Sequence, residues 1–265
     1  MSDPPTLVKA FQGAEAIFAV TNFYDPHILQ NPLEEARQGC AVADIAKETN
    51  VKLVLWSTVP SALLRTGARF DSPRLVENKF TVSQYLKYRK IPHIDVYLGF
   101  FMENWINFSS ISIAPDGAIE VHQARLKEKT KLGMVYAERD LGRTIIAILT
   151  NYRDKPDMLE KPIYCVGGQY STEDVVEEIK RQTGREAKMI GTPTSGSKDL
   201  DDMYDYYNEW GVYRDVQIPH PETTGLGLTF SSLSDFVREA ALPYSKTLAE
   251  TGLNPKGLGL TVAVS

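Results

Sequence analysis

The chain has 265 residues, a formal net charge of -5 and a hydrophobic fraction of 43%. This is the composition of an ordinary soluble globular protein, long enough to bury one core or one core with a smaller lobe. Because an acidic chain has no general basic surface to neutralise phosphates, we do not expect direct nucleic-acid binding.

The amino-terminal segment and the cysteines indicate a compartment. The segment MSDPPTLVKA lacks the apolar core of a secretory signal, and no later apolar run reaches the ~18 residues that a membrane span needs. The cysteines, Cys40 and Cys165, lie in a helical and a strand pattern, which indicates buried thiols rather than a disulfide. We therefore expect a cytoplasmic protein without a membrane partner.

The stretch from Ala14 to Asp25 organises the first part of the chain. Its apolar run, Ala16 to Val20, is bounded by small polar and turn-forming residues and predicts a buried strand of a parallel sheet. Ligands of open α/β sheets bind beyond the carboxyl ends of the strands. Thr21, Asn22 and Phe23 are therefore predicted to lie at a binding site.

The elements around this strand alternate between helix and strand. A short helix or turn precedes it, and two helices and two strands follow it, at Thr6 to Gly13, Leu33 to Thr49, Val51 to Trp56, Leu75 to Arg89 and His93 to Phe100. Strand, helix and strand in this order predict parallel strands whose carboxyl ends share one edge of the sheet.

The remaining elements predict a second, more irregular region. A turn signature at Pro115 to Gly117 marks the change of character, and we expect the break between residues 106 and 107. Further elements are predicted at Arg139 to Tyr152, Pro162 to Val166, Ser171 to Gly184, Ala187 to Ile190, Leu200 to Val212 and Ser231 to Ala240, with an arm or disordered tail after Pro243. Leu200 to Val212 is interpreted as a surface helix docking an aromatic face, with a binding lid as the alternative.

Several segments carry a family likeness. The segments VTNFYD, LVLWST, Lys79 with the following FTVSQYL, GFFMENW and YAERDLGRTIIAIL, in this order, resemble the NmrA-like proteins. These are atypical short-chain dehydrogenases that include fungal nitrogen regulators, a human redox sensor and oxidoreductases. The likeness runs from about residue 6 to residue 240.

The resemblance implies an α/β fold with a Rossmann-like parallel sheet that binds NADP(H). In such proteins a GxxGxxG loop and a helix N-terminus hold the pyrophosphate after the first strand. This chain has no such motif, and the resemblance begins near the family's fourth strand. We therefore expect an incomplete sheet in an amino-terminally truncated family member, with 1–106 as the partial cofactor domain and 107–265 as the smaller substrate-side region, to which residues 139–190 contribute sheet and helices. NADP(H) binding is expected to be weak.

The resemblance also assigns candidate site residues. Lys79 matches a lysine near the nicotinamide, where it could hold a substrate oxygen or relay a proton, and Ser57 matches the serine of ordinary short-chain dehydrogenases. Leu75 stands where those enzymes have a tyrosine, so their usual mechanism is absent. A solvated Lys79 and a strand-capping Ser57 are the alternatives. The resemblance places Thr21, Asn22, Phe23, Lys79, Phe100, Phe101 and Asn104 at the cofactor, with core packing as the alternative for Phe100 and Phe101.

No pattern indicates a metal or a nucleophile. The four histidines have no ligand spacing, and neither a Gly-x-Ser-x-Gly elbow nor a Cys-His pairing is present. Three functions stay open: an NAD(P)-dependent oxidoreductase acting on a small organic metabolite, for example in a secondary-metabolite pathway; a non-catalytic regulatory or redox-sensing protein with a protein partner; and a cofactor-independent isomerase or cyclase.

The strand Ala16 to Val20 also bears on association. If no other strand pairs with its outer side, it is an apolar edge strand with neither a charge nor a proline to protect it. We therefore expect a homodimer through this edge or a tendency to aggregate.

Overall fold

The computed structural model describes residues 3–70 and 74–252. The contacts divide the chain into two units. Unit 1 contains residues 1–98, 143–165 and 225–228, and unit 2 contains residues 99–142, 166–224 and 229–265. The break expected from the sequence, between residues 106 and 107, lies eight residues later in the chain than the first boundary between the units.

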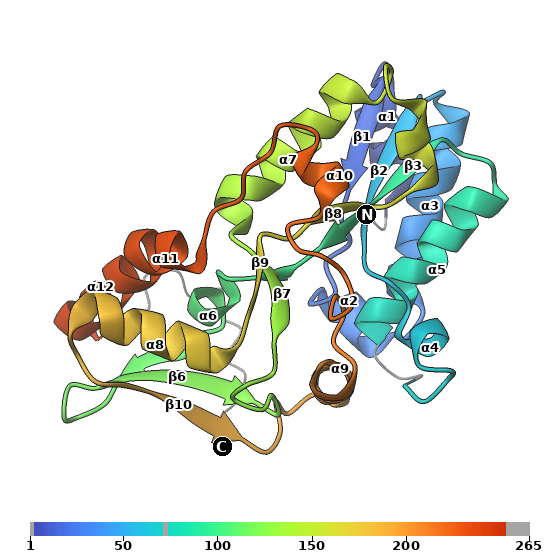
Figure 1. Ribbon diagram of the computed structural model, residues 1–265. Coiled ribbons are helices and arrows are strands. Elements are labelled where there is room, and N and C mark those ends of the chain that lie inside the picture. Colours follow the sequence, from blue (N-terminus) through green and yellow to red (C-terminus); the bar gives the residue numbers. More distant parts are fainter. Residues whose placement is uncertain (1–2, 71–73, 253–265) are drawn as a thin grey trace. The chain divides into compact units, whose positions relative to one another are not determined.

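Unit 1 is built on a four-stranded parallel sheet (Figure 1). Its strands, in spatial order, are β1 (Ala16–Ala19), β2 (Leu53–Thr58), β3 (His93–Leu98) and β8 (Ile163–Cys165). Every residue of β2 is buried, as expected for a central strand of a covered parallel sheet. The predicted α/β fold and the shared edge of the three strand ends are confirmed.

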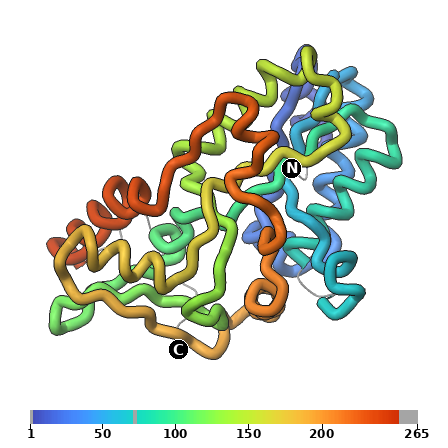
Figure 2. The backbone as a smooth tube through the Cα atoms, in the orientation of Figure 1, coloured from blue at the N-terminus to red at the C-terminus, as the bar shows by residue number. Residues whose placement is uncertain are grey.

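Helices cover this sheet and supply its crossovers. They are α1 (Pro4–Phe11), α2 (Pro26–Gln30), α3 (Glu34–Glu48), α4 (Ala62–Arg65), α5 (Arg74–Tyr88) and the 3₁₀ turn η1 (Pro156–Glu160). α3 and α5 lie side by side, and the tube from blue to cyan in Figure 2 follows the chain from strand to helix to strand. A Cβ on Gly39 of α3 would collide with Val82 of α5 and would lie 3.0 Å from the Trp56 ring. The glycine therefore permits the close packing of both helices on β2.

Unit 2 contains two small sheets of three strands each. In one, β6 (Ile119–Ala124) lies between β10 (Ala187–Thr192), which is parallel to it, and β5 (Ile111–Ile113), which is antiparallel. In the other, β7 (Leu132–Val135) lies between β4 (Phe100–Phe101) and β9 (Gly168–Tyr170). α8 (Thr172–Thr183) lies along β6 and β10 (Figure 1).

The remaining helices of unit 2 surround one apolar core. They are α6 (Asn104–Asn107), α9 (Lys198–Glu209), α10 (Pro221–Thr224), α11 (Leu233–Phe236), the π-helical turn η2 (Val237–Ala241) and α12 (Leu242–Thr251). The core joins Trp105, Tyr136 and Phe236 to apolar residues of α8 and the sheets. α9 buries Leu200, Met203 and Tyr206, and Tyr207 packs partly buried against the core, so the predicted docking is confirmed for these residues; Trp210, just beyond the helix, is exposed. α7 (Ala137–Asn151) begins in unit 2 and continues into unit 1.

Three details of the chain-order prediction are wrong. Ser57 and Thr58 do not follow the second strand but belong to it. The strand predicted from His93 to Phe100 is broken at Gly99, where a Cβ would lie 2.9 Å from the Met134 carbonyl carbon. Only a glycine permits this approach, after which the chain continues as β4. The third error is the tail after Pro243, which is helical as far as Thr251; residues 253–265 lie outside the described part of the chain.

Two expectations concern the boundaries of the fold. Among the described strands, β1 pairs with β2 alone, so association through its other edge stays a prediction. Within residues 3–70 and 74–252, no helix is long and apolar enough to cross a membrane.

Candidate functional site

Three side chains meet just beyond the carboxyl end of β1. The ammonium of Lys79, on α5, donates to the Thr21 backbone carbonyl at 3.0 Å and to the Thr21 hydroxyl at 2.6 Å. The Thr21 hydroxyl donates in turn to Glu35 Oε1, on α3, at 2.7 Å. The same Glu35 oxygen lies 3.0 Å from Lys79 Nζ. We call these residues, Thr21, Glu35 and Lys79, the strand-end cluster.

The strand-end cluster contains an ion pair between Glu35 and Lys79 that is largely covered by the protein. The side chain of Glu35 is 1% exposed and that of Lys79 is 15% exposed. A lysine ammonium has three N–H donors, and three acceptors surround this one. The alternative of a solvated Lys79 is therefore wrong, and its ammonium is bonded within the protein. The helix that carries Lys79 is fixed to β2 because the Trp56 indole donates to the Lys79 carbonyl at 2.9 Å.

Glu35 was not singled out in the sequence, although a signal was present. It stands four residues before Gly39 and seven before Val42, on the buried face of α3. A carboxylate at such a position needs a partner, because an unpaired buried charge is costly. The sequence could identify the position but not the partner, which lies on another helix.

The other unit 1 candidates lie around this cluster. Asn22 is exposed and its side-chain oxygen accepts the Tyr24 amide at 3.1 Å, which shapes the turn after β1. Phe23 is buried and packs edge to face with the Tyr24 ring. Ser57 is 3% exposed and stands opposite Val96 in the sheet. The structure therefore places Ser57 inside β2, whereas the serine interpretation had placed it beyond the strand end.

The remaining candidates, Phe100, Phe101 and Asn104, belong to unit 2. Phe100 packs against the apolar core of that unit, its ring centroid 5.8 Å from that of Trp105. Phe101 pairs with Val135 between β4 and β7, and Asn104 begins α6. The core-packing alternative therefore describes Phe100. The proposed cofactor role of these three residues stays a prediction.

Carboxylates of the chain itself lie at the helix N-termini that follow β1 and β2. Asp25 accepts the His27 amide at 2.9 Å at the start of α2, and Glu34 and Glu35 form the first turn of α3. Glu77 accepts the Leu63 amide at 3.0 Å at the start of α4 and also the Ser61 hydroxyl at 2.9 Å. A helix N-terminus attracts anions through its free amides and its dipole. These carboxylates occupy such amides or add negative charge beside them, which disfavours a phosphate there.

Two further carboxylates organise the start of α7 in unit 2. Glu103 accepts the amides of Ala137 at 3.2 Å and Glu138 at 2.6 Å. Asp140 is buried and accepts the Ser231 amide at 2.8 Å and the Ser231 hydroxyl at 3.1 Å. Both acids lie in the segments GFFMENW and YAERDLG that carry the family resemblance, but neither was identified as important from the sequence.

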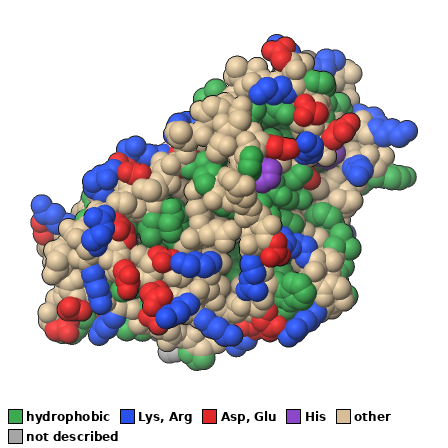
Figure 3. Space-filling view, viewed as in Figure 1, with side chains coloured by type: hydrophobic (Ala, Val, Ile, Leu, Met, Phe, Trp, Pro, Cys, Tyr) green, Lys and Arg blue, Asp and Glu red, His purple; other side chains and the backbone are tan. Residues whose placement is uncertain are grey.

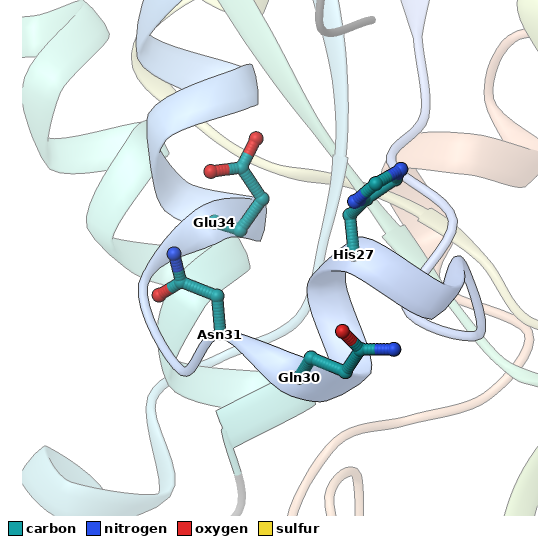
Figure 4. Close-up of a pocket in the computed structure, with 4 residues that line it drawn as sticks. All are labelled: His27, Gln30, Asn31 and Glu34. Carbon is teal, nitrogen blue, oxygen red and sulfur yellow. The ribbon is translucent and has the colours of Figure 1, made fainter.

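A small polar pocket of about 320 Å³ lies between α2 and the first turn of α3 (Figure 4). His27, Gln30, Asn31 and Glu34 line it. Two of these groups are partly engaged: Asn31 Oδ1 accepts the Leu33 amide at 3.2 Å, and Glu34 Oε1 accepts the Gln38 side-chain amide at 3.3 Å. The pocket can offer hydrogen bonds to a small polar molecule.

The described surface carries both signs of charge and no cluster of metal ligands. Acidic and basic side chains are interspersed on the face shown in Figure 3. Within the described ranges, no group of three or more His, Cys, Asp or Glu side chains could hold a metal ion. Cys40 and Cys165 are free thiols, the first half-buried and the second buried.

A four-stranded parallel sheet with crossover helices defines a Rossmann-type α/β protein. The residues that could bind a ligand lie beyond the carboxyl ends of its strands, as in such proteins. Residues 1–226 match the model of the NmrA-like family. The chain belongs to this family. Because the match starts at residue 1, the expected amino-terminal truncation is not shown and stays a prediction.

Several relatives put this family in context. A stretch of 146 residues is 31% identical to the nitrogen metabolite repression protein nmr of Neurospora crassa; it covers 53% of this chain and 28% of that protein. The solved structure of NmrA, a negative transcriptional regulator, has a TM-score of 0.75 at 18% identity, over 94% of this chain and 80% of that one. The triphenylmethane reductase of Citrobacter sp., solved with NADP(H), has a TM-score of 0.64 at 13% identity, over 90% and 80%. These structural likenesses show the fold.

Proposed function

We propose that this chain is a regulatory binding protein of the NmrA type and does not turn over a substrate. The observation that supports this proposal best is the state of Lys79, the residue expected to be central to catalysis. Its ammonium already donates to the Thr21 carbonyl and hydroxyl and pairs with the Glu35 carboxylate. A proton-transfer group must be within reach of the substrate proton, and this one is directed into the protein.

Two more features support a binding role. Leu75 cannot act as the acid that a tyrosine supplies in ordinary short-chain dehydrogenases. Carboxylates also lie at the N-termini of α2, α3 and α4, so in this part of unit 1 a pyrophosphate would meet negative charge instead of free amides. NmrA, a negative transcriptional regulator that has been solved with NAD and with NADP, is the relative on which the regulatory role rests, and the partner would accordingly be another protein.

An NAD(P)-dependent oxidoreductase that acts on a small organic metabolite is the second candidate. The shared fold with an NADP(H)-complexed reductase favours it, as does the place of Lys79 beyond the strand ends. In that case Lys79 would leave the strand-end cluster when substrate and cofactor bind. NADP(H) would be the cofactor, and Ser57 would need to become accessible from within β2.

Two measurements on the purified 265-residue chain test these candidates; the first concerns the cofactor, and the second, turnover, decides between them. Calorimetric titration with NADPH should show binding weaker than micromolar, and NADPH oxidation with a panel of quinones and carbonyl compounds should not exceed the rate in buffer. A triphenylmethane reductase assayed with a triphenylmethane dye serves as the positive control for the NADPH oxidation assay. Turnover above the rate in buffer would establish the oxidoreductase instead, and a fall of about 10²-fold in a Lys79→Met chain that circular dichroism shows to be folded would assign proton transfer to Lys79.

A further inference from the structure

The carbonyl of Thr21 lies beyond the hydrogen-bonded sheet. β1 ends at Ala19, and its ladder with β2 pairs Ala19 with Trp56 as the last couple. Thr21 lies outside this ladder of described strands, and the Lys79 ammonium donates to its carbonyl at 3.0 Å. The conformation of the segment that leads to Asn22 and Phe23 thus depends on a side chain of α5.

We propose that Glu35 is the positioning residue of this strand end. Its carboxylate lies 3.0 Å from the Lys79 ammonium and accepts the Thr21 hydroxyl at 2.7 Å, so one oxygen fixes both groups that meet at the end of β1. Without this charge, the largely covered Lys79 would lose the acidic partner that it has among the described residues. Glu35 therefore acts on residues 21–23 through Lys79 and Thr21.

The three bonds of the strand-end cluster support one another. The Thr21 hydroxyl accepts from Lys79 and donates to Glu35, so each bond polarises the next. The second Glu35 oxygen is buried and has no hydrogen-bond partner among the described residues. The carboxylate is thus held by Lys79 and Thr21 on one oxygen, and removing either partner leaves a buried acid poorly satisfied.

This role predicts that Glu35 controls how accessible the Lys79 amine is. Acetic anhydride acylates accessible lysines, and peptide mass spectrometry reports the rate at each one. Lys79 of the native chain should react more slowly than Lys198, whose side chain is 79% exposed. In Glu35→Gln the Lys79 rate should rise at least about tenfold, because a hydrogen bond to a charged group contributes roughly that factor or more.

A matched surface pair provides the control. Lys198 pairs with Asp202 at the surface of α9, so Asp202→Asn removes the carboxylate partner of an exposed lysine. The labelling rate of Lys198 in this variant should change less than about twofold, since exposed ion pairs contribute little to the free energy. Glu35→Asp keeps the charge but withdraws it by one methylene, and the Lys79 rate should fall between those of the native chain and Glu35→Gln.

Hydrogen exchange gives a second readout that mere loss of stability does not produce. In Glu35→Gln the amides of residues 22–24 should exchange faster while those of β2 keep their protection. If Glu35→Gln does not fold, the paired variant Glu35→Met with Lys79→Met replaces the ion pair with apolar side chains, and the same local increase is expected. The proposal is overturned if Lys79 of the native chain reacts as fast as Lys198, or if neither variant changes exchange at residues 22–24.

Discussion

Unit 1 and unit 2 each contain an ion pair between a carboxylate and a basic side chain, but the two pairs differ in burial: one lies in the strand-end cluster and the other joins Arg125 to Asp205 of α9. In the first, Glu35 and Lys79 are 1% and 15% exposed. In the second, Asp205 of α9 accepts from the Arg125 guanidinium, and the two side chains are 37% and 38% exposed. Each pair joins segments that lie far apart in the sequence.

Burial gives the two pairs different consequences. A surface pair gains little, since water and salt screen both charges before and after it forms. A buried pair has given up hydration, so each charge depends on the other, and removal of one leaves the other stranded. The comparison teaches that the worth of a carboxylate in this protein is set by what covers it more than by the length of its bonds.

The largest effect is expected for Lys79→Met. The substitution leaves the Glu35 carboxylate buried without its cation, and the free energy of unfolding should fall by about 3–5 kcal/mol. Urea unfolding at pH 7 measures it, with Lys198→Met as the surface control. A loss below about 1 kcal/mol would mean that water reaches Glu35 and that the buried and exposed pairs are alike.

Glu103→Ala tests a carboxylate that accepts backbone amides, and we expect an intermediate loss of stability. Glu103 accepts two amides at the start of α7, and its removal should cost about 1 kcal/mol, the usual contribution of a helix cap with a favourable charge. Thermal unfolding followed by circular dichroism measures the loss. Glu138→Ala, on the exposed side of the same turn, should cost clearly less; equal losses would show that Glu103 contributes only general negative charge.

Asp95→Asn sharpens the comparison because this partly buried acid has no cation at bonding distance among the described residues. Asp95 Oδ1 has no hydrogen-bond partner among the described residues, and burial raises the pKa of the carboxyl, an effect that the neighbouring His93 and Ser83 oppose. A raised folded-state pKa means that stability is fully present below the unfolded pKa of about 3.9 and is lost as pH rises through the folded value.

The variant should therefore be more stable than the native chain at pH 7, by on the order of 1 kcal/mol, and the gain should shrink toward pH 4. Urea midpoints across pH 4 to 8 give the profile. A variant that is less stable at pH 7, or a gain that does not depend on pH, would show that the Asp95 carboxylate makes favourable interactions that outweigh its burial.

The smallest change in the free energy of unfolding is expected for Asp205→Asn, which removes the exposed ion pair between α9 and Arg125. An exposed pair contributes at most about 1 kcal/mol, and raising the ionic strength to 1 M should remove most of the difference from the native chain. Urea midpoints at low and high salt test it. A loss comparable to that of Lys79→Met would show that burial does not separate the two pairs.

Local sequence determined most of the elements and some of their ends. Ser171 and Asp174 form the predicted capping box of α8, and Gly184 ends that helix with a φ of +65° that glycine adopts freely. The apolar runs at β1, β2 and β3 predicted parallel strands and their common edge, and the order of family segments predicted the fold. The caps and the apolar runs depend on residues a few positions apart, so short-range spacing and backbone chemistry suffice to specify them, whereas the family likeness depends on the order of segments along most of the chain.

Tertiary structure alone decided what the polar residues do. Lys79 meets Thr21 across 58 positions of sequence, and Glu103 meets the start of α7 across 34. Spacing along the chain placed Glu35 on a buried face but could not name its partner, and it could not show that β3 must break at Gly99 against Met134. Each of these outcomes depends on which helix or strand packs beside the residue, because burial and distance in space determine the energy of a charge and the room for a side chain.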